Sequence, residues 1–131
     1  MNLIDAVKAG HEKQVERFLQ EGADPDGVVF FTPLLVYALS TNRAAIARLL
    51  VRYGADVHVL DHQGWTPLHR AALIGDLTLV NLLLNAGARL GARDWRGKTP
   101  LDVAREYGNA EMIALLETWR NRRRKRERKN K

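Results

Sequence analysis

Apolar residues recur at helical spacing in several separate stretches of the chain. The clearest stretch holds Leu79, Val80, Leu82, Leu83 and Leu84. Most of these side chains fall on one side of a helix, which indicates an amphipathic helix with one buried face. Segments such as residues 54–64 are instead rich in turn-forming residues and have no helical period. The pattern therefore predicts short helices that are separated by loops.

Three short sequence markers recur along the chain with one period of 32 to 34 residues. The markers are Thr-Pro-Leu starting at 32, 66 and 99, Gly-Ala starting at 22, 54 and 87, and a Gly or Asn at 10, 42, 75 and 108. A fixed period in this range is typical of architectures that stack one supersecondary unit. We therefore expect a solenoid of repeated units.

The physical roles of the markers predict the content of each unit. Thr before Pro places a capping hydroxyl ahead of a residue suited to the first helical turn, so Thr-Pro starts a helix. The Gly or Asn marker tolerates the left-handed conformation that ends this first helix. Gly-Ala follows 12 residues after the markers at 10, 42 and 75 and ends a second helix. The remaining residues form a projecting, hairpin-like finger.

The third unit carries a family resemblance. It contains Thr66-Pro67-Leu68-His69-Arg70-Ala71-Ala72, preceded by Gly54-Ala55-Asp56 and Asp61-His62-Gln63-Gly64. This sequence resembles the ankyrin repeat, and the likeness extends over residues 1–119. It implies an all-α ankyrin-repeat solenoid of four helix-pair units with β-hairpin-like loops, at about 1–31, 32–65, 66–98 and 99–119.

The first and last units depart from this pattern. The first begins with Leu3-Ile4-Asp5-Ala6 and resembles an N-terminal cap, and the finger after it is short and lacks the Asp-x-x-Gly turn. The last unit resembles a C-terminal cap, because Arg105 replaces the alanine on a face that no further repeat would cover. No glycine at position 120 ends its second helix. Residues 120–131 are therefore expected to be a frayed helix or disordered, with disorder favoured beyond Arg123.

Composition narrows the possible classes of protein. With 131 residues, 46% hydrophobic and 27% charged, the chain fits one folded domain of ordinary globular composition. It has no cysteine, which excludes disulfides, Cys-ligated metal sites and thiol nucleophiles. The first residues lack the basic region of a signal peptide, and no run is apolar enough to span a membrane. We therefore expect a soluble protein that is cytoplasmic, or nuclear in a eukaryote.

The net charge of +6 is concentrated in one segment. Residues 120–131 hold nine Lys or Arg and one Glu, whereas residues 1–119 carry a net charge of −2. The basic residues of this tail are Arg120, Arg122, Arg123, Arg124, Lys125, Arg126, Arg128, Lys129 and Lys131. Three roles are open for them: solubility, an electrostatic clamp on an acidic partner, or nucleic-acid contact and nuclear import. No aromatic residue interleaves the run, so nucleic-acid binding would be non-specific and salt-sensitive.

Candidate catalytic and metal-binding residues have structural interpretations in the repeat. The resemblance implies a structural hydrogen bond for His69, and His11 lies at a turn between helices. His58 and His62 lie in a loop with no third metal ligand nearby. Carboxylates in the fingers fit turn-stabilising roles: Asp24 with Asp26, and Asp56 with Asp61. The glycines form no phosphate-binding motif, so we expect no enzyme activity, cofactor or metal.

The positions that stacking does not bury are the candidates for partner binding. They lie at the finger tips and on the outward faces of the first helices. The candidates are Phe30, Phe31, Leu60, His62, Gln63, Trp65, Arg70, Leu73, Ile74, Arg93, Trp95, Arg96 and Lys98, together with Val28, Val29 and Val103. Tryptophan is enriched at binding hot spots. Alternatively, Trp65 and Trp95 brace neighbouring fingers, and Phe30 and Phe31 fold under the first helix.

These features favour a non-catalytic protein–protein interaction module. The fingers and the concave face of the first helices would bind a partner protein, with the chain acting as an adaptor or an inhibitor. Basic residues around the tryptophans suggest a partner with an acidic segment. The alternative is a nucleic-acid-associated recruiter whose basic tail contacts the phosphate backbone. We expect the chain to be monomeric on its own and to have no membrane partner.

Overall fold

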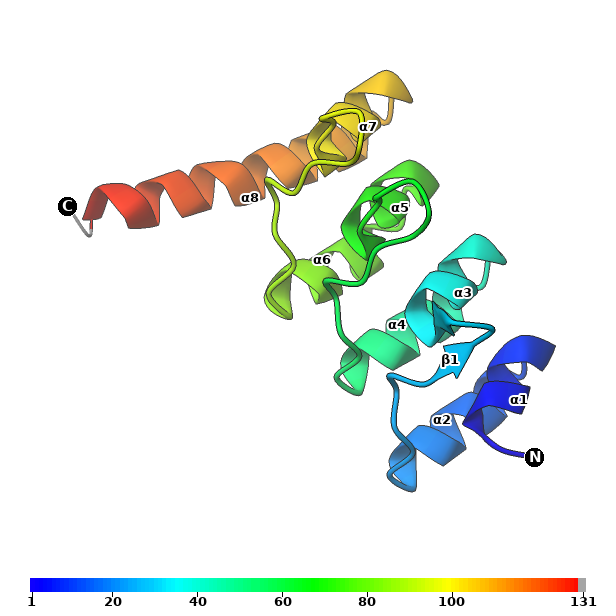
Figure 1. Ribbon diagram of the computed structural model, residues 1–131. Helices are drawn as coiled ribbons and strands as arrows, with labels where there is room; N and C mark the ends of the chain where they lie inside the picture. The colour runs from blue at the N-terminus through cyan, green and yellow to red at the C-terminus, as the bar shows by residue number, and fades with distance from the viewer. Residues whose placement is uncertain (130–131) are drawn as a thin grey trace.

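The computed structural model describes residues 1–129, which form eight helices and one short hairpin. The helices are α1 (Leu3–Ala9), α2 (Glu12–Gln20), α3 (Leu34–Ser40), α4 (Ala44–Arg52), α5 (Pro67–Ile74), α6 (Leu77–Asn85), α7 (Pro100–Glu106) and α8 (Ala110–Lys129). The strands β1 (Val28–Val29) and β2 (Thr32–Pro33) lie between α2 and α3. Figure 1 shows the elements in chain order along one elongated stack. The predicted all-α solenoid of helix pairs is confirmed.

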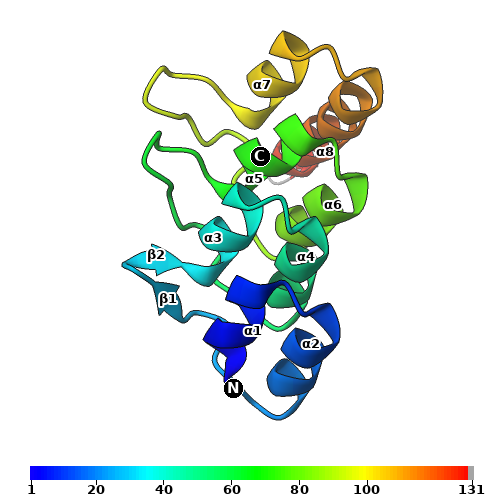
Figure 2. The same ribbon diagram turned by 90° about the vertical axis from the view of Figure 1, so that its right-hand side faces the viewer.

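The helix pairs form two layers, with the fingers beside the first layer. Helices α1, α3, α5 and α7 make up the first layer, and α2, α4, α6 and α8 make up the second (Figure 2). Successive first helices pack on one another, and α4 packs on both α2 and α6. The fingers project from the side of the first layer that faces away from the second (Figure 2). The fingers and the open face of the first helices therefore lie on the same side of the molecule.

Two of the three Thr-Pro pairs cap helices as predicted. Thr66 Oγ1 accepts a hydrogen bond from the His69 backbone N–H at 3.3 Å, and Thr99 Oγ1 accepts one from Asp102 N–H at 3.2 Å. The first helices are followed by residues with positive φ at Gly10, Asn42, Gly75 and Gly108, as expected for left-handed termination. The side chain of Asn109 lies against Gly75, whose φ is +83°.

The Thr32-Pro33 pair does not start a helix, which corrects the prediction for this position. These two residues form β2 and pair with β1 in the register Val28↔Pro33 and Val29↔Thr32. Leu34 begins α3, and its N–H donates to the carbonyl of Gly27 at 2.9 Å. Leu35 stands three residues after Thr32, where the capping boxes of α5 and α7 have a side chain that bonds back to the threonine N–H. Without that acceptor, the threonine joins the hairpin.

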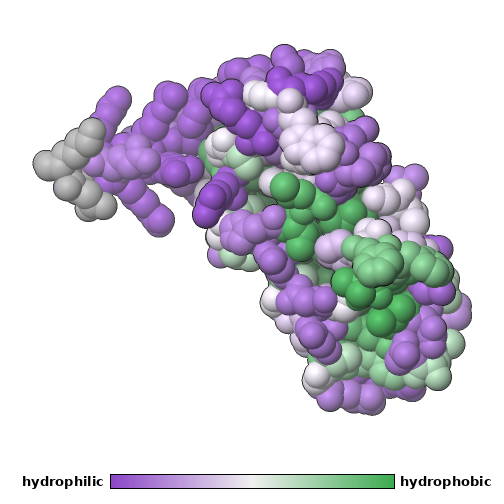
Figure 3. Space-filling view, in the orientation of Figure 1, coloured by the Kyte–Doolittle hydropathy of each residue, from purple (hydrophilic) through white to green (hydrophobic). Residues whose placement is uncertain are grey.

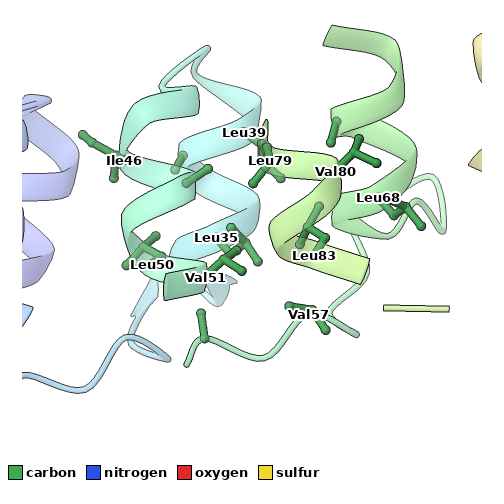
Figure 4. Packing of buried hydrophobic residues seen from close by; sticks show 14 of the residues in the cluster. Leu35, Leu39, Ile46, Leu50, Val51, Val57, Leu68, Leu79, Val80 and Leu83 are labelled. Atoms are coloured by element: carbon green, nitrogen blue, oxygen red, sulfur yellow. The ribbon is translucent and has the colours of Figure 1, made fainter. Parts of the chain in front are cut away.

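Buried leucines at equivalent repeat positions join the two layers into one continuous core. Leu34, Leu68 and Leu101 come from the Thr-Pro-Leu markers of the first helices, and all are buried. The second helices supply buried leucines at intervals of 33 residues, at positions 50, 83 and 116. Figure 4 shows Leu50, Leu68 and Leu83 among the side chains packed between neighbouring helices. Each repeat therefore completes its core only against its neighbours.

Helix α8 is much longer than the other second helices. It has 20 residues, whereas α2, α4 and α6 have nine each. Its apolar stripe packs on the core: Met112 and Leu116 are buried, and Leu115 and Trp119 are partly buried. No helix among residues 1–129 is both long and apolar enough to cross a membrane.

The basic segment continues α8, so residues 120–129 have the helical one of the two forms expected for the tail. The helix extends to Lys129 and projects away from the stack (Figure 1). Arginine and lysine are good helix formers, and no glycine interrupts the run. Arg123 Nε also lies 3.5 Å from a carboxylate oxygen of Glu127, one turn later. Lys131 of the predicted tail lies outside the described residues.

Candidate functional site

A groove of about 500 Å³ lies between the second and third fingers and the first helices beside them. Its lining residues are His62, Gln63, Trp65, Arg70, Leu73, Asp94, Trp95, Arg96 and Tyr107. Seven of these nine were predicted from the sequence; Asp94 and Tyr107 were not. Tyr107 precedes Gly108 as Ile74 precedes Gly75. Aligning the repeats therefore places Tyr107 at the position equivalent to Ile74, which was a predicted contact. Asp94 occupies the turn position equivalent to Asp61, so its place in the repeat indicates a turn and not a groove.

Trp65 is buried in the groove floor and braces the two fingers. Only 6% of its surface is exposed, its indole Nε1–H donates to Asp94 Oδ2 at 2.8 Å, and its ring stacks on His69 at 5.9 Å between centroids. The Arg70 guanidinium lies 5.0 Å from the centre of the Trp65 ring. This corrects the interpretation of Trp65 as an exposed contact, because both its apolar surface and its N–H already have partners.

The Asp94 carboxylate organises the third finger. Its Oδ1 accepts hydrogen bonds from the N–H groups of Arg96 at 2.8 Å and Lys98 at 2.9 Å. Burial raises the pKa of Asp94, but the donors from Lys98, Trp65 and Arg96 outweigh burial and lower it to about 2. Asp94 is therefore ionised at neutral pH, and it fixes the shape of the finger from inside.

His69 has the structural role that was predicted for it. Its Nδ1 accepts from Thr66 N–H at 3.1 Å, and its Nε2 donates to the carbonyl of Lys98 at 2.8 Å. Burial lowers the pKa of His69, although the Lys98 carbonyl opposes this shift. The neutral ring thus ties α5 to the third finger. His11 is exposed and makes no side-chain capping bond.

The finger tips expose large apolar side chains. Phe30 is 86% exposed, Phe31 99%, Leu60 54% and Trp95 73%. The Trp95 ring lies over the backbone of Gly64, where a Cβ would collide with it, so one part of this ring braces the second finger while most of it meets solvent. Figure 3 shows an apolar area over the β1–β2 hairpin and the neighbouring α3. Every finger therefore presents an apolar side chain at its tip.

The Phe30–Phe31 tip has an unusual backbone. The two residues close the hairpin with φ of +48° and +68°, the signs that a two-residue type I′ turn requires and that Asn-Gly normally supplies. The left-handed region costs a residue with a β-carbon about 1–2 kcal/mol. Lys8 Nζ lies 5.6 Å from the Phe30 ring centre. The expectation that these rings fold under the first helix is wrong, because the tight turn directs them outward.

The other predicted contacts lie outside the groove. Leu60 and Arg93 line a separate pocket of about 350 Å³, and Ile74 and Lys98 are exposed. Val28 is exposed, but Val29 and Val103 are buried and are therefore not free positions. Val29 alternates with Val28 along β1, and Val103 lies on α7, which packs between α5 and α8.

The remaining polar candidates behave as the repeat predicts. Oδ1 atoms of Asp24, Asp56 and Asp61 accept backbone N–H bonds two residues on, and Asp26 Oδ1 accepts from Asp56 N–H at 2.7 Å. Within residues 1–129 no three His, Cys, Asp or Glu side chains are grouped so as to hold a metal ion. The carboxylates of the fingers thus stabilise turns and connect successive fingers.

The basic tail is only partly gathered into a site. Arg122, Arg123 and Arg126 join Arg89 and Trp119 around a second groove. Five other basic residues of the described tail do not line it: Arg120, Arg124, Lys125, Arg128 and Lys129. The long helix therefore divides the tail into a groove-facing set and an outer set.

Comparisons with known proteins agree with this architecture. A family model for ankyrin repeats (3 copies) matches residues 3–94 and 38–120. Protein phosphatase 1 regulatory subunit 27 of Mus musculus is 35% identical over 78 residues, which cover 55% of this chain and 48% of that protein. Cyclin-dependent kinase 4 inhibitor B of Homo sapiens is 37% identical, with 61% and 59% covered. Notch-regulated ankyrin repeat-containing protein A of Danio rerio is 32% identical, with 58% and 72% covered.

The extent of these matches is enough to assign the family but not the function of any one relative. The aligned region spans about half the length of the phosphatase regulatory subunit, so its role as a whole protein does not carry over. The family match, in contrast, includes helices α1 to α7, α8 as far as residue 120, and both capping boxes. The chain belongs to the ankyrin-repeat family.

Proposed function

We propose that the chain is a non-catalytic protein-binding module that holds a partner protein against its three finger tips and the groove between the second and third fingers. The observation that carries this proposal is the exposure of Phe30, Phe31, Leu60 and Trp95, one or more at each tip. Water-exposed aromatic side chains are costly, and aromatic anchors beside a polar rim are typical of binding hot spots.

The first finger supports this proposal most strongly. The fold gains little from Phe30 and Phe31, because both are almost fully exposed and both occupy left-handed backbone conformations. An Asn-Gly pair would close the same turn with less strain. Backbone strain that no local contact offsets is typical of sites that bind another molecule.

The charges of the groove favour an apolar contact over an acidic one. Arg70 Nη2 lies 3.7 Å from Asp61, and Arg96 Nη2 lies 3.5 Å from Asp94 and 3.8 Å from Glu106. Because these arginines already have carboxylate neighbours, the acidic partner segment suggested by the sequence has less to bind here. We propose instead a partner that presents an apolar surface to the tips.

The relatives support a regulatory role of this kind. One is named a regulatory subunit of a phosphatase and another an inhibitor of a kinase, so both are named for an action on another protein. An adaptor and an inhibitor both follow from a rigid binding surface. The alternative of nucleic-acid recruitment depends on the basic tail alone and is tested with the second groove below.

The test compares partner capture by matched variants of the whole chain. Phe30→Ala with Phe31→Ala, and Trp95→Ala, remove the apolar tips. The control Tyr53→Ala removes an exposed aromatic ring at the end of α4 that lines neither groove. Proteins retained from a lysate of the source cells are compared by mass spectrometry. We expect specific partners to be lost with the tip variants and kept with Tyr53→Ala. Equal capture by all folded variants would exclude the finger surface.

A further inference from the structure

A second groove, of about 570 Å³, lies between α8 and the segment that follows α6. It exists because α8 continues past Trp119, where the other second helices have already ended. Trp119 lines the groove and is held in place, since its indole Nε1–H donates to Asn81 Oδ1 at 3.0 Å. The groove is thus formed by α8, the end of α6 and the loop that follows α6, and it shares no lining residue with the finger groove.

The groove has an excess of positive charge. Arg89 of the loop and Arg122, Arg123 and Arg126 of α8 line it. Within the described residues no Asp or Glu lines this groove. Among the four arginines, Arg123 has a carboxylate neighbour within residues 1–129, the exposed Glu127 on the same helix. The contrast with the finger groove is clear, because both arginines of the finger groove are beside carboxylates.

The groove also has an apolar side. Leu84 at the end of α6, Leu90 in the following loop and Trp119 on α8 contribute it. A ligand that fits both properties carries negative charges on either side of an apolar group. Arginines bind carboxylates with directional hydrogen bonds, and an apolar side chain is stabilised when it leaves water for such a surface.

Two observations favour a peptide over a nucleic acid. Binding of unpaired bases normally uses an open aromatic face for stacking, but the Arg122 guanidinium lies 5.9 Å from the Trp119 ring centre. Trp119 is also partly buried against the core and bonded to Asn81. The aliphatic groove wall offers a place for a leucine-like side chain and gives no advantage to a sugar–phosphate backbone.

We propose that this groove is a second binding site, for an acidic protein segment that carries an apolar residue between its carboxylates. The site is independent of the finger surface and would dock a different part of the same partner or another protein. Arg89, Arg122, Arg123 and Arg126 bind the carboxylates, and Leu84 and Leu90 contact the apolar side chain. The remaining basic residues of α8 add only long-range attraction.

The test separates a site from general attraction by using two triple variants of equal charge. Arg122→Gln, Arg123→Gln and Arg126→Gln remove groove residues, whereas Arg124→Gln, Lys125→Gln and Arg128→Gln remove the same charge from outside the groove. Glutamine keeps the helix propensity nearly unchanged, and circular dichroism checks that both helices remain. The probes are a fluorescein-labelled peptide of glutamates flanking leucines, an all-glutamate peptide of equal charge, and a DNA duplex.

The proposal predicts an ordered set of affinities in fluorescence anisotropy. The leucine-containing peptide should bind the wild type more tightly than the all-glutamate peptide does. The groove variant should lose about tenfold in affinity for it, because three partly exposed ion pairs are removed, and the outer variant less than about threefold. Absence of peptide binding, equal losses in the two variants, or tighter binding of the duplex would each overturn the proposal, and the last result would support nucleic-acid contact instead.

Discussion

At the residue scale, the junction between the second and third fingers depends on one buried carboxylate. Asp94 accepts N–H bonds from Trp65, Arg96 and Lys98, and His69 bonds the Lys98 carbonyl next to it. The Trp65–Asp94 and His69–Lys98 bonds each join residues 29 positions apart in the sequence. Losing one partner would leave a buried charged group poorly solvated, which is more costly than the bond itself is favourable.

The depressed pKa of Asp94 predicts a loss of stability in acid. An unfolded Asp has a pKa of about 3.9, whereas Asp94 has a pKa of about 2 in the folded chain. Between these values only the unfolded chain binds the proton, so the stabilisation is complete above about pH 4 and is lost as the pH falls toward 2. We expect Asp94 to account for roughly 1–2 kcal/mol of this loss, since water screens the exposed Arg96.

Urea denaturation at a series of pH values measures this contribution. Asp94→Asn should be less stable than the wild type at neutral pH and should lose less stability between pH 4 and pH 2. The difference between the two proteins isolates Asp94 from the other carboxylates. Parallel stability curves over this interval would show that Asp94 does not titrate as its contacts imply.

The two finger tryptophans should respond differently to the same substitution. Trp65→Phe keeps an aromatic ring but removes the N–H that Asp94 accepts, and should lower the free energy of unfolding by about 1–3 kcal/mol. Trp95→Phe changes a mostly exposed ring and should lower it by less than about 0.5 kcal/mol. Chemical denaturation of the two variants decides the matter, and equal losses would contradict the assignment of Trp65 as the brace.

This difference could not be predicted from the local sequence. Both tryptophans stand at finger positions where stacking requires no apolar side chain, so both were candidate contacts. What separates them is the acceptor that Asp94, in the next finger, offers to Trp65. His69 was easier to interpret, because its partner Thr66 is three residues away and belongs to the repeat motif itself.

At the element scale, the first finger and α8 are where local sequence rules were least reliable. Thr32-Pro33 has the composition of a helix start but joins a hairpin, because Leu35 cannot complete a capping box and Val28 and Val29 offer a strand. The like charges in the basic run of α8 repel one another, but its residues favour a helix. The run also continues a helix that Leu116 and Trp119 already anchor. In both elements, a neighbouring segment decides between two local possibilities.

The hairpin predicts a variant that gains stability while it loses binding. Phe30→Asn with Phe31→Gly fits the positive φ values of the turn and should raise the free energy of unfolding by about 1 kcal/mol relative to Phe30→Ala with Phe31→Ala. Both double variants should lose partner capture to the same extent, since both lack the rings. Thermal and urea denaturation measure the first effect. Asn-Gly and Ala-Ala variants of equal stability would show that the turn is not strained.

At the scale of the whole molecule, the period of the markers predicted most of the architecture. Leucines one repeat apart, such as Leu50 and Leu83, became equivalent core positions, so the order and pairing of the helices followed from the repeat. The surface did not follow in the same way. The second groove depends on how far α8 extends and on the loop it passes, which no repeat marker encodes.

A solenoid of this kind should unfold in parts when one end is weakened, because each repeat packs only on its neighbours. All three tryptophans lie between positions 65 and 119, so their fluorescence reports on the later repeats, while far-ultraviolet circular dichroism reports on all helices. Leu19→Ala in α2 removes a buried side chain from the first pair, and Leu83→Ala does so in α6. Each substitution should lower the free energy of unfolding of the repeats around it by about 2–5 kcal/mol.

Leu19→Ala and Leu83→Ala should therefore differ in whether the circular dichroism and fluorescence curves still coincide. With Leu19→Ala, circular dichroism should begin to change at lower urea concentration than fluorescence, since α1 and α2 unfold while the later repeats stay folded. With Leu83→Ala, both signals should shift together, because α6 packs on α4 and carries the Asn81 contact of Trp119. Coincident curves for Leu19→Ala would mean that coupling between neighbouring repeats exceeds the stability of the first pair, and the stack would then unfold as a single unit.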